Sequence, residues 1–233
     1  MKIAPLITAP LDMTGIDCWV FDLDNTLYPA SCRLFDQVDR RIGEYVQQLL
    51  NLDPVAARAL QKQYFRDHRT TLNGLMLNHK IKPEDFLAFV HQIDLSPVLE
   101  DPRLDAALAR LPGRKVIYTN GSTRHAENVM GKLGVARHFD GIFDIAEAGF
   151  VPKPEMSAYR ALLERHAIDP KRAVMFDDMP RNLAPAAELG MKTVWVRTDV
   201  EWAQPEQEID FITYTADNLA DWLHEISGEK DRA

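Results

Sequence analysis

Four short segments of the sequence carry acidic, hydroxyl or cationic side chains close to the ends of apolar runs. They are FDLDNTLY at 21–28, IYTNG at 117–121, VPKPEMSAY at 151–159 and MFDDMPRN at 175–182. Their candidate reactive residues are Asp22, Asp24, Thr119, Asn120, Lys153, Asp177 and Asp178. Carboxylates that gather at one place repel one another, and a divalent cation relieves this repulsion. If these segments meet in space, they predict a site that binds a cation.

The first segment directly follows the apolar run 18–21. Asn25 and Thr26 favour a turn at that point, which would bring Asp22 and Asp24 together where the run ends. A lone acidic pair of this kind is usually a solvated loop. The order and placement of all four segments are what point to chemistry.

Strand-like apolar runs alternate with helical segments over most of the chain. The runs lie at 18–21, 115–119, 141–145, 173–176 and 193–196. Short continuous apolar runs are typical of parallel strands that are covered on both faces. The alternation therefore predicts an α/β fold with a Rossmann-like, doubly wound parallel sheet.

Helix signals lie between the later runs. Ser122 is a candidate N-cap for a helix through Lys132 that ends near Gly134. Pro154 suits the first turn of a helix that reaches about residue 166, and Pro180 begins another that ends near residue 190.

Residues 33–110 break the alternation, because no strand is predicted among them. Asp53-Pro54 and Lys82-Pro83 each begin an amphipathic helix there. We expect a helical cap at 33–110, inserted after the first strand, and an α/β catalytic core made of residues 1–32 and 111–233. Such a cap could cover the carboxyl ends of the strands, where open α/β sheets bind ligands.

The four segments resemble, in order, the four motifs of the haloacid-dehalogenase-like superfamily. The resemblance extends from about Asp17 to Val196. Within that superfamily the chain is similar to the pyrimidine 5′-nucleotidase-like phosphatases. The narrower similarity rests on YFRDHRTTLNGLMLNH, TNGSTRHAENV and FDDMPRNLAPAAELGMKTVWV. The helical block resembles the class I cap of the superfamily, which excludes water and selects the leaving group.

The resemblance implies a magnesium-dependent phosphatase. Asp22 matches the nucleophile that forms an aspartyl phosphate, and Asp24 matches the general acid and base. Thr119 and the amides after it match the phosphoryl site, and Lys153 matches the cation that neutralises charge there. Asn120 matches a possible contact to phosphate or leaving group.

The resemblance also implies the ligands of Mg²⁺. They are the Asp22 carboxylate, the backbone carbonyl of Asp24 and the Asp178 carboxylate, with Asp177 as a supporting acid. Asn182 stands where some relatives carry a further acid. His125 matches a histidine of the nucleotidase-like group, with surface packing as its alternative role.

Cap residues Thr70, Thr71, Gly74, Leu75 and His79 match the cap pattern of the group. The candidate substrate-binding residues of the cap are Thr70, Thr71, Asn73 and His79. Hydrogen bonds from them to a base or ribose would favour UMP and CMP. The chain departs from the pattern at three cap positions. His68 stands in place of the usual Tyr, Arg69 in place of Gly, and Asn73 in place of Arg. Sugar phosphates and pyridoxal phosphate therefore stay open as substrates.

Three other functions fit the same fold. A phosphomutase shares the core, and a haloacid dehalogenase shares the nucleophile but has no use for Asp24 or a pair of acids at 177 and 178. A non-catalytic module would be expected to lose motif residues, and none is lost here.

Composition limits the partners. The 233 residues are 46% hydrophobic and carry a formal net charge of −8, which argues against nucleic acid polymers and anionic membranes. We expect a small phosphorylated substrate and no obligate protein partner. The sequence has only two cysteines and no signal-peptide pattern, and it contains no run near the roughly 18 apolar residues of a membrane span. These features predict a cytoplasmic protein.

Overall fold

The computed structural model describes residues 11–200, 203–204 and 210–228. Within these residues, a parallel sheet contains β1 (Cys18–Phe21), β2 (Arg114–Tyr118), β3 (Gly141–Phe143), β4 (Ala173–Asp177), β5 (Lys192–Val196) and β6 (Tyr214–Ala216). The strands lie in the order β3-β2-β1-β4-β5-β6. The chain therefore winds outward from β1 in both directions. The predicted doubly wound α/β fold is confirmed.

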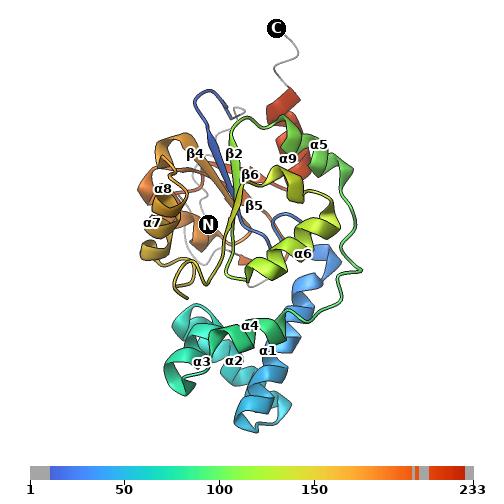
Figure 1. Ribbon diagram of the computed structural model, residues 1–233, viewed down its shortest axis with the longest axis vertical. Helices are drawn as coiled ribbons and strands as arrows, with labels where there is room; N and C mark the ends of the chain where they lie inside the picture. The colour runs from blue at the N-terminus through green and yellow to red at the C-terminus, as the bar shows by residue number, and fades with distance from the viewer. Residues whose placement is uncertain (1–10, 201–202, 205–209, 229–233) are drawn as a thin grey trace.

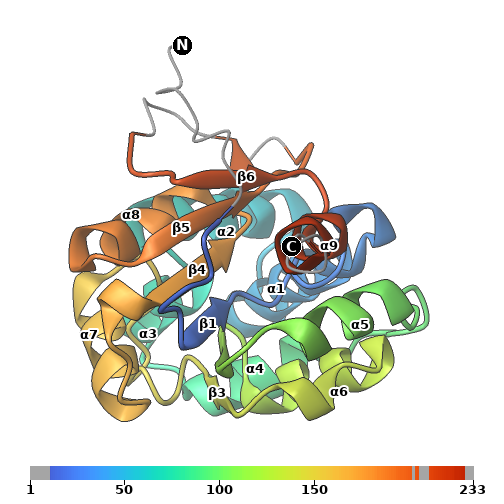
Figure 2. The ribbon, with the colours of Figure 1, turned by 90° about the horizontal axis from the view of Figure 1, so that it is seen from above.

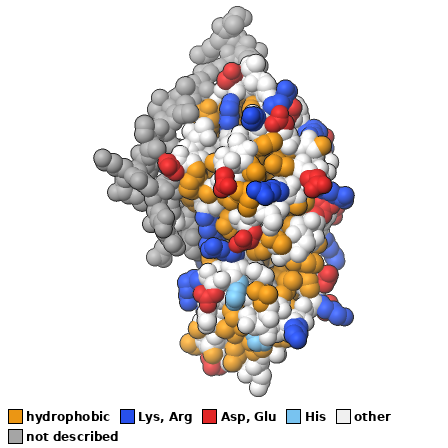
Figure 3. Space-filling view, turned by 90° about the vertical axis from the view of Figure 1, so that its left-hand side faces the viewer, with side chains coloured by type: hydrophobic (Ala, Val, Ile, Leu, Met, Phe, Trp, Pro, Cys, Tyr) orange, Lys and Arg blue, Asp and Glu red, His pale blue; other side chains and the backbone are white. Residues whose placement is uncertain are grey.

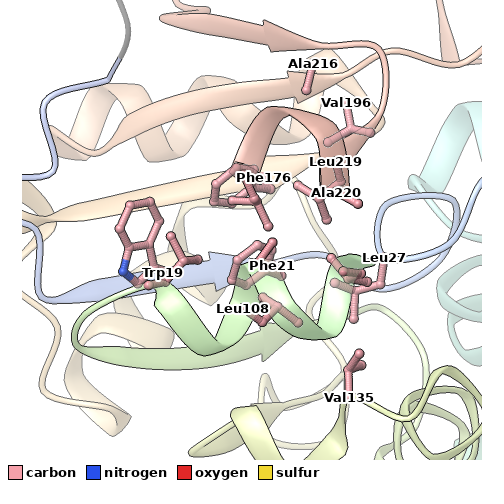
Figure 4. Close-up of a cluster of buried hydrophobic side chains, with 14 of the residues drawn as sticks. Trp19, Phe21, Leu27, Leu108, Val135, Phe176, Val196, Ala216, Leu219 and Ala220 are labelled. Carbon is pink, nitrogen blue, oxygen red and sulfur yellow. The ribbon is translucent and has the colours of Figure 1, made fainter. Parts of the chain in front are cut away.

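Helices cover both faces of this sheet (Figure 2). On one face lie α5 (Pro102–Arg110), α6 (Thr123–Leu133) and α9 (Leu219–Gly228), and on the other α7 (Met156–Arg165) and α8 (Pro180–Leu189). Side chains alternate along β1, so Trp19 and Phe21 enter one apolar cluster and Cys18 and Val20 the other. Figure 4 shows the first cluster, in which Phe21 stacks on Phe176 of the neighbouring strand with ring centroids 4.5 Å apart.

Four helices form a separate layer beyond the carboxyl ends of the strands (Figure 1). They are α1 (Leu34–Leu50), α2 (Pro54–His68), α3 (Thr71–His79) and α4 (Pro83–Val90). These helices bury their own apolar cluster, which includes Val46, Leu75 and Phe86. The predicted helix starts at Asp53-Pro54 and Lys82-Pro83 are confirmed, because Asp53 and Lys82 are the N-cap residues of α2 and α4.

The expected cap, residues 33–110, includes helix α5 (Pro102–Arg110). Helix α5 packs against α9, and its Leu104 and Leu108 belong to the same cluster as Phe21 of the sheet. We therefore propose that the cap is residues 33–90 with a short connection, and that α5 is part of the core. Residues 1–10, 201–202, 205–209 and 229–233 of the expected core lie outside the described residues.

Two predicted element ends are wrong for local reasons. Helix α7 begins at Met156, and Pro154 lies before it, because residues 151–154 carry Lys153 toward the sheet edge. Strand β3 ends at Phe143, because the chain turns at Asp144 and the carboxylate of Asp144 stabilises this turn. The carboxylate oxygens accept hydrogen bonds from the Thr123 and Ala146 amides. The short β6 was not expected from the sequence.

The turn after β1 and the helix after β2 follow the sequence signals. Asn25 adopts a left-handed conformation with φ of 61°, and Leu27 N donates to Leu23 O. Ser122 is the N-cap of α6, and Gly134, with φ of 76°, is its C-cap. In the part of the chain that the structure describes, no helix has the length and apolar character needed to cross a membrane.

Two helical glycines give a paired stability test. A Cβ on Gly74 of α3 would lie 2.5 Å from the Tyr64 ring, whereas a Cβ on the exposed Gly131 of α6 would meet nothing within 4 Å. We expect Gly74→Ala to lower the free energy of unfolding by about 1–3 kcal/mol through overpacking of the cap. Gly131→Ala should raise it by about 0.5–1 kcal/mol. Urea denaturation of both variants measures the difference, and equal shifts would contradict the packing described for α2 and α3.

Candidate active site

The predicted reactive residues meet at the carboxyl edge of the sheet. Asp22 follows β1, Thr119 follows β2, and Asp177 ends β4. Phe21 pairs with Phe176 in the parallel ladder, so the next residues of both strands, Asp22 and Asp177, emerge side by side. This point lies where the winding of the sheet reverses, which is where such sheets hold ligands.

Lys153 bridges these two carboxylates. Its Nζ lies 2.7 Å from Asp22 Oδ1, 2.7 Å from Asp177 Oδ2 and 3.1 Å from Tyr118 O, so all three ammonium hydrogens have acceptors. Burial disfavours the charged ammonium, but the charges of Asp177 and Asp22 outweigh it and raise the pKa of Lys153. The lysine therefore stays cationic although only 3% of it is exposed.

One lysine does not balance the acids around it. Ligand oxygens of Asp22, Asp177 and Asp178 lie within 4.8 Å of one another, and all three residues are buried. Burial raises the pKa of Asp22 to about 7, with Lys153 opposing and Asp177 adding to the shift. Burial and the charge of Asp22 also raise the pKa of Asp178. Asp178 Oδ2 is buried without a hydrogen-bond partner.

This unpaired oxygen indicates which acid is suited to a metal. Asp177 Oδ2 receives Lys153, while its Oδ1 accepts from the Met179 amide at 2.9 Å and from Asn182 Nδ2 at 2.9 Å. Both oxygens of Asp177 are thus committed to protein donors. Asp178 keeps an oxygen for a ligand, and buried oxygen donors of this kind suit Mg²⁺.

Asp24 has a different environment from the other acids. Its Oδ1 accepts from Tyr28 Oη at 2.6 Å and lies 2.8 Å from His125 Nε2. Burial alone would raise the pKa of Asp24, but the charge and hydrogen bond of His125 and the Tyr28 hydroxyl lower it to about 2. Burial lowers the pKa of His125, but Asp24 outweighs it and raises that pKa overall. His125 thus contacts Asp24 directly rather than only packing on the surface of α6.

Thr119 and Asn120 shape the loop after β2. Thr119 Oγ1 accepts from the Gly121 amide at 2.9 Å, and Asn120 Oδ1 accepts from the Lys153 amide at 2.9 Å. Thr26 Oγ1 donates to Asp22 Oδ2 at 2.8 Å. These bonds fix the loops that carry Asp22 and Lys153.

A cavity of about 200 Å³ lies between the cap and this edge of the sheet. Its lining includes Asp22, Asp24, Thr119, Asn120, Lys153 and Asp178 from the core, and Thr70 and Thr71 from the cap. On the face shown in Figure 3, acidic and basic side chains are interspersed around core and cap alike.

Asn73 and His79 do not line the cavity, so the structure does not bring these two candidates to the site. Asn73 Nδ2 donates to His68 O at 3.1 Å within the turn before α3, and His79 Nε2 lies 2.8 Å from Tyr64 Oη. Even the two lining threonines have structural partners. Thr70 Oγ1 accepts from the Asn73 amide, and Thr71 Oγ1 donates to Gln61 O.

Sequence reasoning missed several lining residues. They are Phe35, Phe65, His91 and Arg181. Arg181 Cζ lies 4.8 Å from the centroid of the Phe65 ring and thereby links core and cap. Arg69 also lines the cavity, and its backbone has a φ of 70°, a conformation that glycine adopts more readily than other residues.

Comparison with known proteins agrees with this geometry. Residues 16–190 match the family of haloacid dehalogenase-like hydrolases. The chain belongs to that family.

The chain is 28% identical to Phosphate metabolism protein 8 of Saccharomyces cerevisiae over 189 residues, which are 73% of this chain and 58% of the yeast protein. It thus spans little more than half of that relative's length. It is similar in structure to the HAD-hydrolase YfnB from Bacillus subtilis bound to magnesium, with a TM-score of 0.60 and 16% identity over 91% of this chain and 98% of that one. A HAD phosphatase from Thermococcus onnurineus gives a TM-score of 0.59 and 18% identity with the same coverage. At these identities the two structures show the fold alone.

The charge imbalance predicts a metal-dependent stability. We expect Mg²⁺ to raise the melting temperature of the protein, with a gain in the free energy of unfolding that grows with the logarithm of the Mg²⁺ concentration and reaches about 2.7 kcal/mol at 100 times Kd. Asp178→Asn should lose this response. In EDTA it should be more stable than the wild type, because it removes a buried unpaired carboxylate whose burial costs roughly 1–3 kcal/mol of folding free energy. Differential scanning calorimetry measures both effects. Asp67→Asn makes the same change on the exposed side of α2 and serves as the control, and a Mg²⁺ response retained by Asp178→Asn would rule out this ligand.

Proposed function

We propose that this hydrolase is a phosphatase that hydrolyses phosphomonoesters through an aspartyl phosphate on Asp22. The observation that carries the proposal is the Lys153 bridge. It holds Asp22 in the lining of the cavity and places the Lys153 ammonium group beside Asp22 Oδ1, close to where the charge of a bound phosphoryl group would lie. Such charge is what a lysine and a metal ion are suited to stabilise. The name of the yeast relative supports phosphate chemistry.

In the first step, an Asp22 carboxylate oxygen forms the bond to phosphorus as the bond to the leaving oxygen breaks. The leaving oxygen takes a proton from the hydrogen-bonded pair Asp24–His125, which lies at the same cavity. In the second step, Asp24 accepts a proton from the water that attacks phosphorus, and the Asp22 carboxylate is regenerated. Thr119 and the loop amides after it bind the phosphoryl oxygens.

Mg²⁺ fits this site, and its ligands would be the Asp22 and Asp178 carboxylates and the Asp24 backbone carbonyl. The unpaired Asp178 Oδ2 is the observation that supports this assignment. When bound, the ion neutralises charge on the carboxylates and on the transferring group. Asp177 orients Lys153 and is itself fixed by Asn182.

The nucleophile can be tested by an isosteric change. Asp22→Asn should lower kcat at least about 100-fold, because an amide cannot form the acyl phosphate. Phosphate release and circular dichroism would be measured together, so that loss of activity is separated from loss of fold. Asp17→Asn is the matched control, because the exposed Asp17–Arg172 pair precedes the same strand. Activity above a few per cent of wild type in Asp22→Asn would assign the nucleophile elsewhere.

For the substrate, we propose nucleoside 5′-monophosphates such as UMP and CMP. The small cavity has an apolar and aromatic side under the cap, with Phe35, Phe65 and Leu72 beside Thr70 and Thr71. That lining suits a flat ring of modest size. Phosphates of sugars or pyridoxal are the alternative class, and a phosphomutase would differ by retaining the phosphoryl group.

A panel of phosphomonoesters with Mg²⁺ distinguishes these substrates. We expect kcat/KM for UMP and CMP to exceed that for AMP and GMP by about tenfold or more, because even one misfitting methylene in a pocket costs roughly 1–3 kcal/mol and a purine adds a whole ring. Released phosphate is the readout, and glucose 6-phosphate and pyridoxal phosphate are the comparison substrates. Equal or better hydrolysis of those two would remove the nucleotidase assignment and leave the phosphatase reaction in place.

A further inference from the structure

His91 reaches the active-site cavity from the end of the cap. It is the residue that ends α4, at the junction between the cap and the connection to the core. Its side chain lines the cavity together with Asp24, Thr119 and Gly121. Its imidazole stacks on that of His125, with ring centroids 4.3 Å apart and planes 8° from parallel. The cap therefore contributes a ring that lies against the direct neighbour of Asp24.

Ser122 is the hydrogen-bond partner of His91 at Nδ1. His91 Nδ1 is 2.9 Å from Ser122 Oγ, which also accepts from the His125 amide at 3.3 Å. A neutral imidazole that accepts the Ser122 hydroxyl hydrogen at Nδ1 carries its own hydrogen on Nε2, whereas one that donates from Nδ1 leaves Nε2 as an acceptor.

The ring is held in its neutral form. Burial lowers the pKa of His91 to about 3, and the charge on His125 adds to this shift. His91 therefore offers one N–H donor at neutral pH without adding a positive charge.

Nε2 of His91 lies close to the loop that follows β2. It is 3.6 Å from the position that a Cβ on Gly121 would occupy, and the same position is 3.2 Å from Thr119 Oγ1 and 3.3 Å from His125 Cδ2. The absence of a side chain at Gly121 thus lets the His91 ring lie close to Thr119, the residue to which we assign the phosphoryl oxygens. Because His91, Thr119 and Gly121 line the same cavity, a donor at Nε2 would lie beside a phosphoryl group bound there.

We propose that His91 Nε2–H donates a hydrogen bond to an oxygen of the bound phosphomonoester, and that Ser122 and His125 position the ring for this contact. The inference rests on the proposed phosphatase function and adds to it the C-cap residue of the last cap helix. Because His91 ends the last cap helix, this contact ties the placement of the cap to the presence of substrate.

Three substitutions separate a donor from a packing residue. His91→Phe keeps a flat ring on His125 but loses the N–H, His91→Ala loses both, and His91→Gln places an amide N–H close to Nε2. With p-nitrophenyl phosphate and Mg²⁺, we expect kcat/KM to fall about 10- to 100-fold in both the Phe and Ala variants, and the Gln variant to recover part of it. His224→Phe on α9 is the matched control. Near-normal activity in His91→Phe with a loss in His91→Ala would show packing alone and overturn the inference.

Two further measurements sharpen the test. Histidine-ring NMR on the protein without substrate should show His91 with its hydrogen on Nε2, assigned by the signal lost in His91→Phe, and a hydrogen on Nδ1 would overturn the inference. Inhibition by inorganic phosphate identifies the acceptor. A weaker inhibition in His91→Phe places the bond on a phosphoryl oxygen, and an unchanged one places it on the leaving group. A wild-type protein that releases no phosphate refutes the proposed function, whereas an active wild type with an unimpaired His91→Phe refutes this inference alone.

Discussion

The structure depends on the neutralisation of the carboxylates that are buried at the carboxyl edge of its parallel sheet. Pairing of β1 with β4 forces Asp22 and Asp177 to emerge beside each other, and Asp178 follows one residue later. Like charges at this distance and burial are strongly unfavourable without neutralisation. Lys153 supplies part of it, and its position explains why Asn120, Tyr118 and the chain before α7 are bonded as they are. The loops of the site are thus arranged around one ammonium group.

The acids at this edge of the sheet differ in their environments and therefore in the direction in which their pKa values are shifted. Asp22 and Asp178 lie in surroundings where burial raises their pKa, whereas the bonds from His125 and Tyr28 lower that of Asp24. Groups whose environments push their pKa values in opposite directions are suited to different steps of one reaction. Because His125 stacks on His91, the environment of Asp24 also includes the cap. Core and cap therefore share the site rather than merely enclosing it.

The sequence predicted the core well because its signals are local and strong. Continuous apolar runs marked five of the strands, and Ser122, Gly134 and Pro180 marked helix ends through backbone chemistry that does not depend on the rest of the fold. The cap was harder. Asn73 and His79 were candidates for substrate binding, but only tertiary packing decides that they bond to His68 and Tyr64 instead of lining the cavity. Strand β6 has three residues and was missed, because so short a run has no distinct periodicity.

The net charge of −8 does not conflict with an anionic substrate, but it limits how one can bind. At the cavity floor the acids outnumber the adjacent cation, so a phosphate dianion would meet repulsion from Asp22 and Asp178. A divalent cation changes the sign of that local field, because it lies within a few ångströms of the phosphate while the remaining surface charge is screened over about 8–10 Å. In the proposed mechanism, the cation that relieves repulsion among the carboxylates would thus also allow the substrate to approach. Stability and substrate binding would then be coupled through one ion, and removing either Asp178 or the metal would affect both.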